Sequence, residues 1–144
     1  MNWKIIAAGK PALDYAKKGI DEYLGRLRAA TKSEIHFVKT GSGLHARMLE
    51  LSDGCYRIFL DERGRQFTSR GFASEIQKLE NRSISRCAIL VGSSDGWDDA
   101  MRSHADMLWA LGTITLQHEL ALLVALEQIY RAHAILAGSP YHRD

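Results

Sequence analysis

Short apolar runs separated by turn-forming residues divide the chain into predicted strands and helices. Five runs have the length and apolar character of strands, and they cover 3–8, 34–38, 56–60, 87–91 and 107–111. Cys87–Val91 is apolar throughout, which is typical of a strand covered on both faces. Asp61-Glu62-Arg63-Gly64 has the composition of a turn and is expected to end the third strand.

Helical periodicity occupies the intervals between these runs. Pro11 suits the first turn of a helix that reaches about Ala30, and Ser69 can cap a helix that extends to about Asn81. Shorter helical pieces are expected near 45–51 and 98–104, and a last helix from about 119 to 137. Strands alternating with helices predict a single α/β domain over residues 1–144, with a mostly parallel sheet flanked by helices and ligands at the carboxyl ends of the strands.

The last helix is apolar over nearly its whole circumference. Leu120, Leu123, Val124, Leu126 and Ile129 together cover more than one face of it. A helix of this kind cannot leave one side in water, and a chain of 144 residues offers little else to cover it. We therefore expect a homodimer that buries the second apolar face.

Composition narrows the class of protein. Hydrophobic residues make up 46% of the chain, no run approaches the roughly 20 apolar residues of a membrane helix, and the first residues carry no cleavage signal, so a cytoplasmic protein without a membrane segment is expected. Residues 1–86 carry 16 Lys and Arg against 10 Asp and Glu, whereas residues 87–144 carry 3 against 7. A basic part beside an acidic part slightly favours a polyanion as partner.

The sequence lacks the motifs of several common catalytic and metal-binding sites. Gly92-Ser93-Ser94-Asp95-Gly96 fits neither a phosphate-binding P-loop nor a serine-hydrolase elbow. His118-Glu119 begins like a zinc-protease motif, but Leu122 stands where the second histidine is required. Cys55 and Cys87 lie far apart, so no metal site and no disulfide framework is expected.

The specific signal lies in the C-terminal third. Ile89-Leu90-Val91-Gly92 is followed in order by Asp95-Gly96, Thr115-Leu116-Gln117-His118-Glu119-Leu120, Glu127-Gln128-Ile129-Tyr130-Arg131-Ala132 and Pro140-Tyr141-His142-Arg143. This series resembles the ribosomal RNA large subunit methyltransferase H family of the SPOUT methyltransferases. Ala8-Gly9-Lys10 and Leu60-Asp61-Glu62-Arg63-Gly64 match as well, so the resemblance covers essentially the whole chain.

The resemblance implies both an activity and a fold. It implies a homodimeric enzyme that uses S-adenosylmethionine to methylate N3 of a pseudouridine in the 23S RNA of the large ribosomal subunit. It also implies a C-terminal trefoil knot, which composition and periodicity do not predict, since knots are rare. Large-subunit ribosomal RNA within the ribosome is then the expected partner, with no membrane and no metal ion.

The resemblance further implies where the cofactor binds. On the matching positions, the pocket is expected to consist of Leu60, Gly92, Leu111, Gly112, Thr113, Ile114, Thr115 and Leu116. These residues suit the task, because an adenine ring needs an apolar slot with backbone donors and acceptors, and glycine lets the backbone approach closely. His118 lies beside this loop and is expected to order it.

The tail is expected to act on the nucleoside. The N3 imide keeps its proton at neutral pH, so a group that accepts this proton or stabilises the anion would assist. The resemblance makes His142 the candidate for the first role, Arg143 for the second, and Tyr141 for stacking on or orienting the base. The alternative is that these residues only fix the C-terminus. Glu127 and Arg131, one turn apart, are expected to form an intrahelical ion pair.

Some positions depart from the family pattern, and they leave two alternatives open. Family members usually have Gly at Ser93, Ser near Ala110 or Gly112, Pro at Gln117 and Arg at Leu122. Loss of the proline is expected to loosen the cofactor loop, and loss of the arginine to change a charge at the dimer or RNA surface. The alternatives are a SPOUT methyltransferase for another RNA target, and a non-catalytic RNA- or ribosome-binding module.

Overall fold

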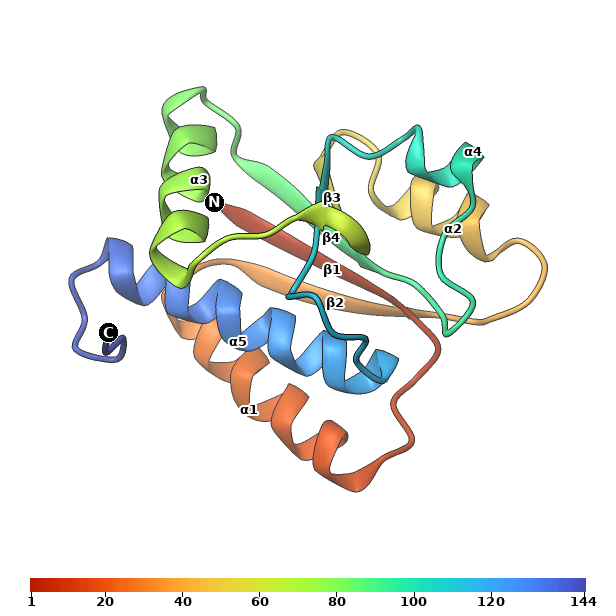
Figure 1. The fold of residues 1–144 in the computed structure, drawn as a ribbon, viewed down its shortest axis with the longest axis horizontal. Coiled ribbons are helices and arrows are strands. Elements are labelled where there is room, and N and C mark those ends of the chain that lie inside the picture. The colour runs from red at the N-terminus through yellow and green to blue at the C-terminus, as the bar shows by residue number, and fades with distance from the viewer.

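The computed structural model describes residues 1–144, which form five strands and five helices (Figure 1). The strands are β1 (Asn2–Ala8), β2 (Ser33–Val38), β3 (Tyr56–Arg65), β4 (Arg86–Val91) and β5 (Met107–Trp109). The helices are α1 (Asp14–Ala30), α2 (Leu44–Leu51), α3 (Ser69–Asn81), α4 (Asp99–Arg102) and α5 (His118–Leu136). None of the helices combines the length and the apolar character needed to span a membrane.

The strands form one sheet in the order β2-β1-β4-β3-β5, and every neighbouring pair is parallel. The predicted α/β class with a parallel sheet is confirmed. Because all strands run the same way, the segments that follow them gather at a single edge of the sheet. Residues 60–63 of β3 and the loops after β4 and β5 therefore meet, although they are far apart in the sequence.

Helices cover both faces of the sheet. The larger core lies on the side of α1, α3 and α5, and the smaller core on the side of α2 and α4 (Figure 1). Neighbouring residues of one strand point to opposite faces, so Ile5 belongs to the larger core and Ile6 to the smaller, and Ile89 and Leu90 divide in the same way. This double burial explains why β1 and β4 are apolar without alternation.

Helix α5 packs between α1 and α3, and it approaches α1 very closely. A Cβ atom added at Gly19 of α1 would lie 2.7 Å from Cδ2 of Leu123, so glycine permits this contact. Leu122 is only 3% exposed and belongs to the larger core. The expectation that position 122 lies at the dimer or RNA surface is therefore wrong, because this face of the helix points into the sheet.

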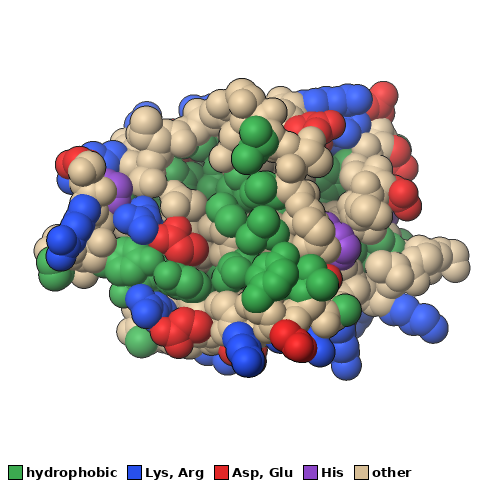
Figure 2. Space-filling model, turned by 60° about the horizontal axis from the view of Figure 1, so that its bottom comes forward, with side chains coloured by type: hydrophobic (Ala, Val, Ile, Leu, Met, Phe, Trp, Pro, Cys, Tyr) green, Lys and Arg blue, Asp and Glu red, His purple; other side chains and the backbone are tan.

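The outer face of α5 stays only partly covered within the chain. Leu120 and Val124 are half-buried, and Leu13, Tyr15 and Ile114 nearby are among the exposed large hydrophobic residues. Figure 2 shows hydrophobic side chains gathered over the side of the molecule on which α1 and α5 lie. A surface of this kind is typical of a protein contact.

Strand β3 does not end at Leu60 as expected but continues to Arg65. Trp109 of β5 pairs with both Leu60 and Arg65, so the residues between them form an irregular bulge inside the strand. A Cβ atom at Gly64 would lie 2.4 Å from the carbonyl carbon of Leu108. The small glycine of this turn-like segment therefore allows two backbones to approach closely. Pairing with β5 keeps the segment in the sheet, and the local sequence gives no sign of this pairing.

Two helix starts also differ from the prediction. Helix α1 begins at Asp14, so Pro11 lies in the preceding loop. Thr68 caps α3 by accepting a hydrogen bond from the Gly71 N–H, whereas the hydroxyl of Ser69 donates to Oε1 of Gln128 on α5. Ser69 thus connects two helices instead of capping one.

Candidate functional site

A cavity of about 570 Å³ lies at the bulge of β3 and the carboxyl ends of β4 and β5, beside the first turn of α5. Its walls come from 60–63, 91–97, 111–112 and 114–118, together with Arg102, Trp109 and Ala121. The volume is within the range of pockets that hold small molecules and cofactors, about 300–1,000 Å³.

The cavity brings together most of the residues predicted to bind a cofactor. Seven of the eight line it, and they are Leu60, Gly92, Leu111, Gly112, Ile114, Thr115 and Leu116. Thr113 belongs to the same loop but does not contribute to the lining. Three segments separated by long stretches of sequence meet here because their strands are neighbours and run in parallel.

The loop 111–116 leaves its backbone polar groups without partners in the chain. None of its N–H or carbonyl groups forms a hydrogen bond within the chain, and residues 113–115 are exposed. A Cβ atom at Gly112 would meet no atom within 4 Å, and the side chain of Ile114 is 72% exposed. The loop therefore presents free donors and acceptors beside apolar side chains.

Trp97 joins the loop after β4 to Leu60, where the bulge of β3 begins. Its indole Nε1 donates a hydrogen bond of 2.7 Å to the carbonyl oxygen of Leu60. A Cβ atom at Gly92 would lie 3.2 Å from two atoms of the Trp97 ring, so glycine leaves room for the ring to pack there. Nothing in the sequence around Trp97 indicates this contact, since its partner lies 37 residues away.

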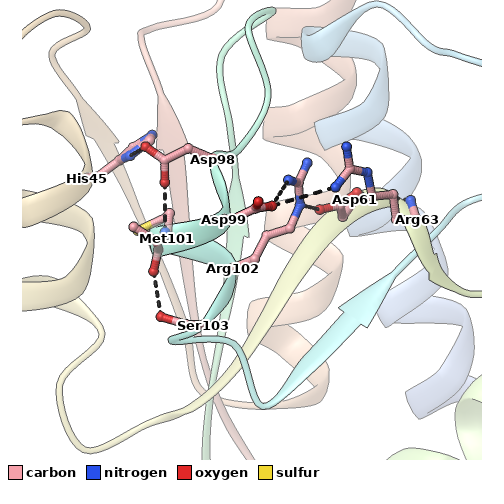
Figure 3. Close-up of polar contacts among 9 residues, drawn as sticks. His45, Asp61, Arg63, Asp98, Asp99, Met101, Arg102 and Ser103 are labelled. Atoms are coloured by element: carbon pink, nitrogen blue, oxygen red, sulfur yellow. Dashed lines mark hydrogen bonds and ion pairs between the residues drawn. The ribbon is translucent and has the colours of Figure 1, made fainter.

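Asp61 and Arg102 form an ion pair in the wall of the cavity (Figure 3). Nε of Arg102 lies 2.6 Å from Oδ2 of Asp61, and the Asp61 side chain is 2% exposed. The other carboxylate oxygen of Asp61 accepts a hydrogen bond of 2.9 Å from the Arg63 N–H. The hydrogen bond to Asp61 is the main cause that raises the pKa of Arg102 above its ordinary value, so the guanidinium stays charged.

The start of α5 is fixed at the floor of the cavity. Gln117 caps the helix, and its side-chain oxygen accepts hydrogen bonds from the Glu119 and Leu120 N–H groups at 2.8 and 3.0 Å. Gln117 therefore orders the first turn of α5 through its side chain, a role that proline could not fill. His118, predicted to order the loop, lines the cavity.

Glu119 ties the same turn to the loop after β1. Its carboxylate accepts hydrogen bonds from the Ala12 N–H at 2.5 Å and the Leu13 N–H at 3.1 Å. These bonds, that of Leu13 foremost, lower the pKa of Glu119 below its ordinary value although burial opposes the shift. The glutamate is therefore a charged structural link, in keeping with the absence of the zinc-protease motif.

The tail residues do not line this cavity. Tyr141 donates a hydrogen bond of 2.9 Å to Oε1 of Glu127, and its hydroxyl lies 3.0 Å from that of Tyr23. Nη2 and Nε of Arg131 donate hydrogen bonds of 2.6 and 3.0 Å to the same Glu127 oxygen. The predicted intrahelical ion pair is therefore confirmed. Burial first, and then these hydrogen bonds, raise the pKa of Tyr141.

His142 is held through both ring nitrogens. Nδ1 lies 3.1 Å from Nη1 of Arg131, and Nε2 lies 3.0 Å from Oδ1 of Asp144. Arginine can only donate, so Nδ1 is the acceptor and Nε2 carries the proton. Arg70 completes the network with two bonds of 2.9 Å to the Asp144 carboxylate, and these bonds first, then His142, lower the pKa of Asp144 to about 2.

The arrangement separates the two halves of the predicted site. Cofactor residues surround the cavity, whereas Tyr141 and His142 pack along α5, and the exposed Arg143 has no hydrogen bond or ion pair to another residue. A second opening, lined by Lys10, Thr40 and His45, adjoins the cavity and shares the 93–97 loop with it. No group of three or more His, Cys, Asp or Glu side chains in the structure could hold a metal ion.

Comparison with known proteins relates this arrangement to one family. Residues 1–142 match the family model described as predicted SPOUT methyltransferase. The chain is 41% identical to ribosomal RNA large subunit methyltransferase H of Thermus thermophilus over 143 residues, covering 99% of both chains. It is 39% identical to the protein of the same name from Deinococcus radiodurans over 145 residues, again covering 99% of each.

Solved structures share the fold at low sequence identity. A probable methyltransferase from Bordetella pertussis superposes with a TM-score of 0.62 at 12% identity, covering 92% of this chain and 96% of that one. The SpoU methyltransferase AviRb from Streptomyces viridochromogenes, solved in complex with AdoMet, superposes with a TM-score of 0.51 at 11% identity, covering 94% of this chain and 58% of that one. At these identities the likeness concerns the fold alone.

Proposed function

The chain belongs to the SPOUT methyltransferase family, and from this premise we propose that it transfers a methyl group from S-adenosylmethionine to N3 of a pseudouridine in large-subunit ribosomal RNA. The observation that carries the proposal is the cavity at the bulge of β3 and the ends of β4 and β5, whose loop 111–116 leaves its backbone groups free. Identity of about 40% over full length to proteins named as large-subunit ribosomal RNA methyltransferases supports this RNA as the substrate.

The residues of the cavity fit the cofactor. An adenine ring needs an apolar slot with backbone donors and acceptors, which the loop 111–116 offers beside Leu60. When bound, S-adenosylmethionine supplies a methyl group on a positively charged sulfur. The task of the chain is then to hold the sulfur and the nitrogen in line, with the reacting atoms roughly 3–3.5 Å apart.

The tail provides the groups for the nucleoside. In our proposal His142 accepts the N3 proton, Arg143 stabilises the resulting anion, and Tyr141 orients the base. His142 can accept a proton at Nδ1 only when its contact with Arg131 opens, because that nitrogen accepts the arginine hydrogen bond. Binding of the RNA would have to release this contact.

A homodimer would bring the two halves of the site together. Helix α5 has 19 residues and thus extends over roughly 28 Å, with the cavity at its start and the tail folded against its second half. The partly covered apolar face of α5, with Ile114 and Tyr15 exposed nearby, supports pairing of two chains (Figure 2). We propose that the tail of one protomer serves the cavity of its partner.

We also propose that residues 1–144 form one domain whose C-terminal part is threaded as a trefoil knot. The support is topological, since the loop after β4 and the segment after β5 enclose one cavity although β3 lies between these strands. Pulling the chain by its two ends should give an unfolded length shorter than that of an open chain. A full length would contradict the knot.

Ribosomes from a strain that lacks the gene provide the direct test. Purified protein and S-adenosylmethionine should add one methyl group to a pseudouridine of the large-subunit RNA, measured by mass analysis of its nucleosides. We expect this reaction in the cytoplasm, where ribosomes assemble. Methylation of another RNA would indicate a different target, and failure to bind the cofactor would indicate a non-catalytic binding module.

The shared site can be tested by mixing two defective chains. Gly112→Trp fills the cavity, and the double variant His142→Ala, Arg143→Ala disables the tail, so each homodimer should be inactive. Random re-pairing should restore about one quarter of the wild-type activity, because half of the dimers would then hold one intact site. If the mixture stays inactive while both chains still pair, the tail does not serve the partner's cavity.

A further inference from the structure

Arg102 is the one arginine of the cavity wall that is held in place by a buried carboxylate. Nε lies 2.6 Å from Oδ2 of Asp61, whose other oxygen is engaged by the Arg63 N–H. The Arg102 side chain is 18% exposed and lines the cavity from α4 (Figure 3). Its guanidinium is therefore ordered before any ligand binds, which lowers the entropic cost of binding.

The guanidinium keeps donors free for a ligand. Nη2 has no hydrogen-bond partner, and Nη1 reaches only Oδ1 of Asp99 at 3.3 Å. The Asp99 side chain is 94% exposed, so this contact is weak in water and easily exchanged. Two terminal nitrogens of a fixed arginine form a fork that matches the two oxygens of a carboxylate.

The methyl donor carries one group that this fork would recognise. Its adenine suits the apolar loop 111–116, and its methionyl part ends in an ammonium and a carboxylate. Both the loop and Arg102 line the same cavity, and Glu62 and Asp95 add negative charge for the ammonium. Building on the proposed function, we propose that Arg102 binds the carboxylate of S-adenosylmethionine and that Asp61 positions Arg102 for this contact.

Two ligands that differ only in the carboxylate isolate the contact. Calorimetry would compare S-adenosylmethionine with decarboxylated S-adenosylmethionine on the wild-type dimer and on Arg102→Gln. The glutamine amide can still donate to Asp61, so that the buried carboxylate keeps a partner. Arg65→Ala is the matched control, because Arg65 lies on the same strand as Asp61 but does not line the cavity, and its side chain is 61% exposed.

Arg102→Gln should weaken binding of S-adenosylmethionine about 10- to 100-fold, the usual range for a lost charge-assisted contact, and leave the decarboxylated ligand within about twofold. Arg65→Ala should change neither affinity. In the methylation assay, KM for the cofactor should rise while kcat changes little. A second variant, Arg102→Lys, should recover part of the affinity, since lysine keeps the charge but not the fork.

Three results would overturn the inference. Equal weakening of both ligands would give Arg102 a structural role only, and an unchanged affinity for S-adenosylmethionine would give it none in cofactor binding. Weaker binding of RNA with cofactor affinity unchanged would assign the arginine to a phosphate. Failure of the wild type to bind either ligand would instead overturn the proposed function, and this inference with it.

Discussion

Replacing Gly64 by alanine should destabilise the fold more than any other single methyl group added at a glycine of this chain. The new Cβ atom would lie 2.4 Å from the carbonyl carbon of Leu108, 2.5 Å from its oxygen and 2.5 Å from the Trp109 nitrogen. All three are backbone atoms, so no side chain can rotate away. Because carbon atoms pack at about 3.5–4.0 Å, β3 and β5 must separate by roughly 1 Å.

The cost follows from this separation. Overpacking costs typically about 1–3 kcal/mol, and weakening one or two hydrogen bonds of the β3–β5 pair adds about 1 kcal/mol for each. We therefore expect the free energy of unfolding to fall by about 3–5 kcal/mol. For a chain of this length, Tm should drop by about 9–20 °C, since each kcal/mol corresponds to about 3–4 °C.

Urea unfolding followed by circular dichroism, with calorimetry for Tm, measures the effect. The matched control is Gly25→Ala, an exposed position inside α1 where an added Cβ atom meets nothing within 4 Å. This variant should be up to about 1 kcal/mol more stable, because alanine favours helix more than glycine does. A Gly64→Ala protein within about 0.5 kcal/mol of wild type would refute the argument that the β3–β5 contact is rigid.

Three further predictions concern side chains that fix the helices. Gln117→Ala should lower the free energy of unfolding by about 1 kcal/mol through the lost cap. Gln117→Pro should lower it less, because φ at this position is −57° and suits proline. Equal losses in urea unfolding would contradict this. Burial lowers the pKa of His133, which accepts a hydrogen bond from Trp3, so stability should fall as the pH drops below about 6.5, and His133→Gln should remove this part of the pH dependence. Glu119→Ala should cost about 2 kcal/mol by leaving two N–H groups unpaired, and Glu119→Gln clearly less; similar melting temperatures for both would show that the acceptor is unimportant.

The sequence predicts those parts of the fold that rest on local patterns. The apolar runs predict all five strands, with β4 the clearest. The long apolar segment near the C-terminus predicts the last helix, α5. The residues predicted for the cofactor meet in one cavity because parallel strands bring their carboxyl ends together. Family motifs identified these positions, and the topology explains their proximity.

Features that depend on distant partners could not be predicted. Asp61-Glu62-Arg63-Gly64 has the composition of a turn, yet pairing with β5 keeps it in the sheet. Asp61 and Arg102 are 41 residues apart, and nothing in either neighbourhood indicates that they meet. Leu122 could be assigned to the core only once the faces of α5 were known, since that helix is apolar almost all round.

Helix α5 acts as a spacer as well as a packing element. One continuous rod of 19 residues begins at the cavity floor and carries the anchors of the tail, Glu127 and Arg131, on its surface. Inserting a single residue before Glu127 would turn these anchors by about 100° and shift them by 1.5 Å without altering any side chain of either site. We therefore expect insertions or deletions in this part of α5 to disturb the site far more than substitutions do.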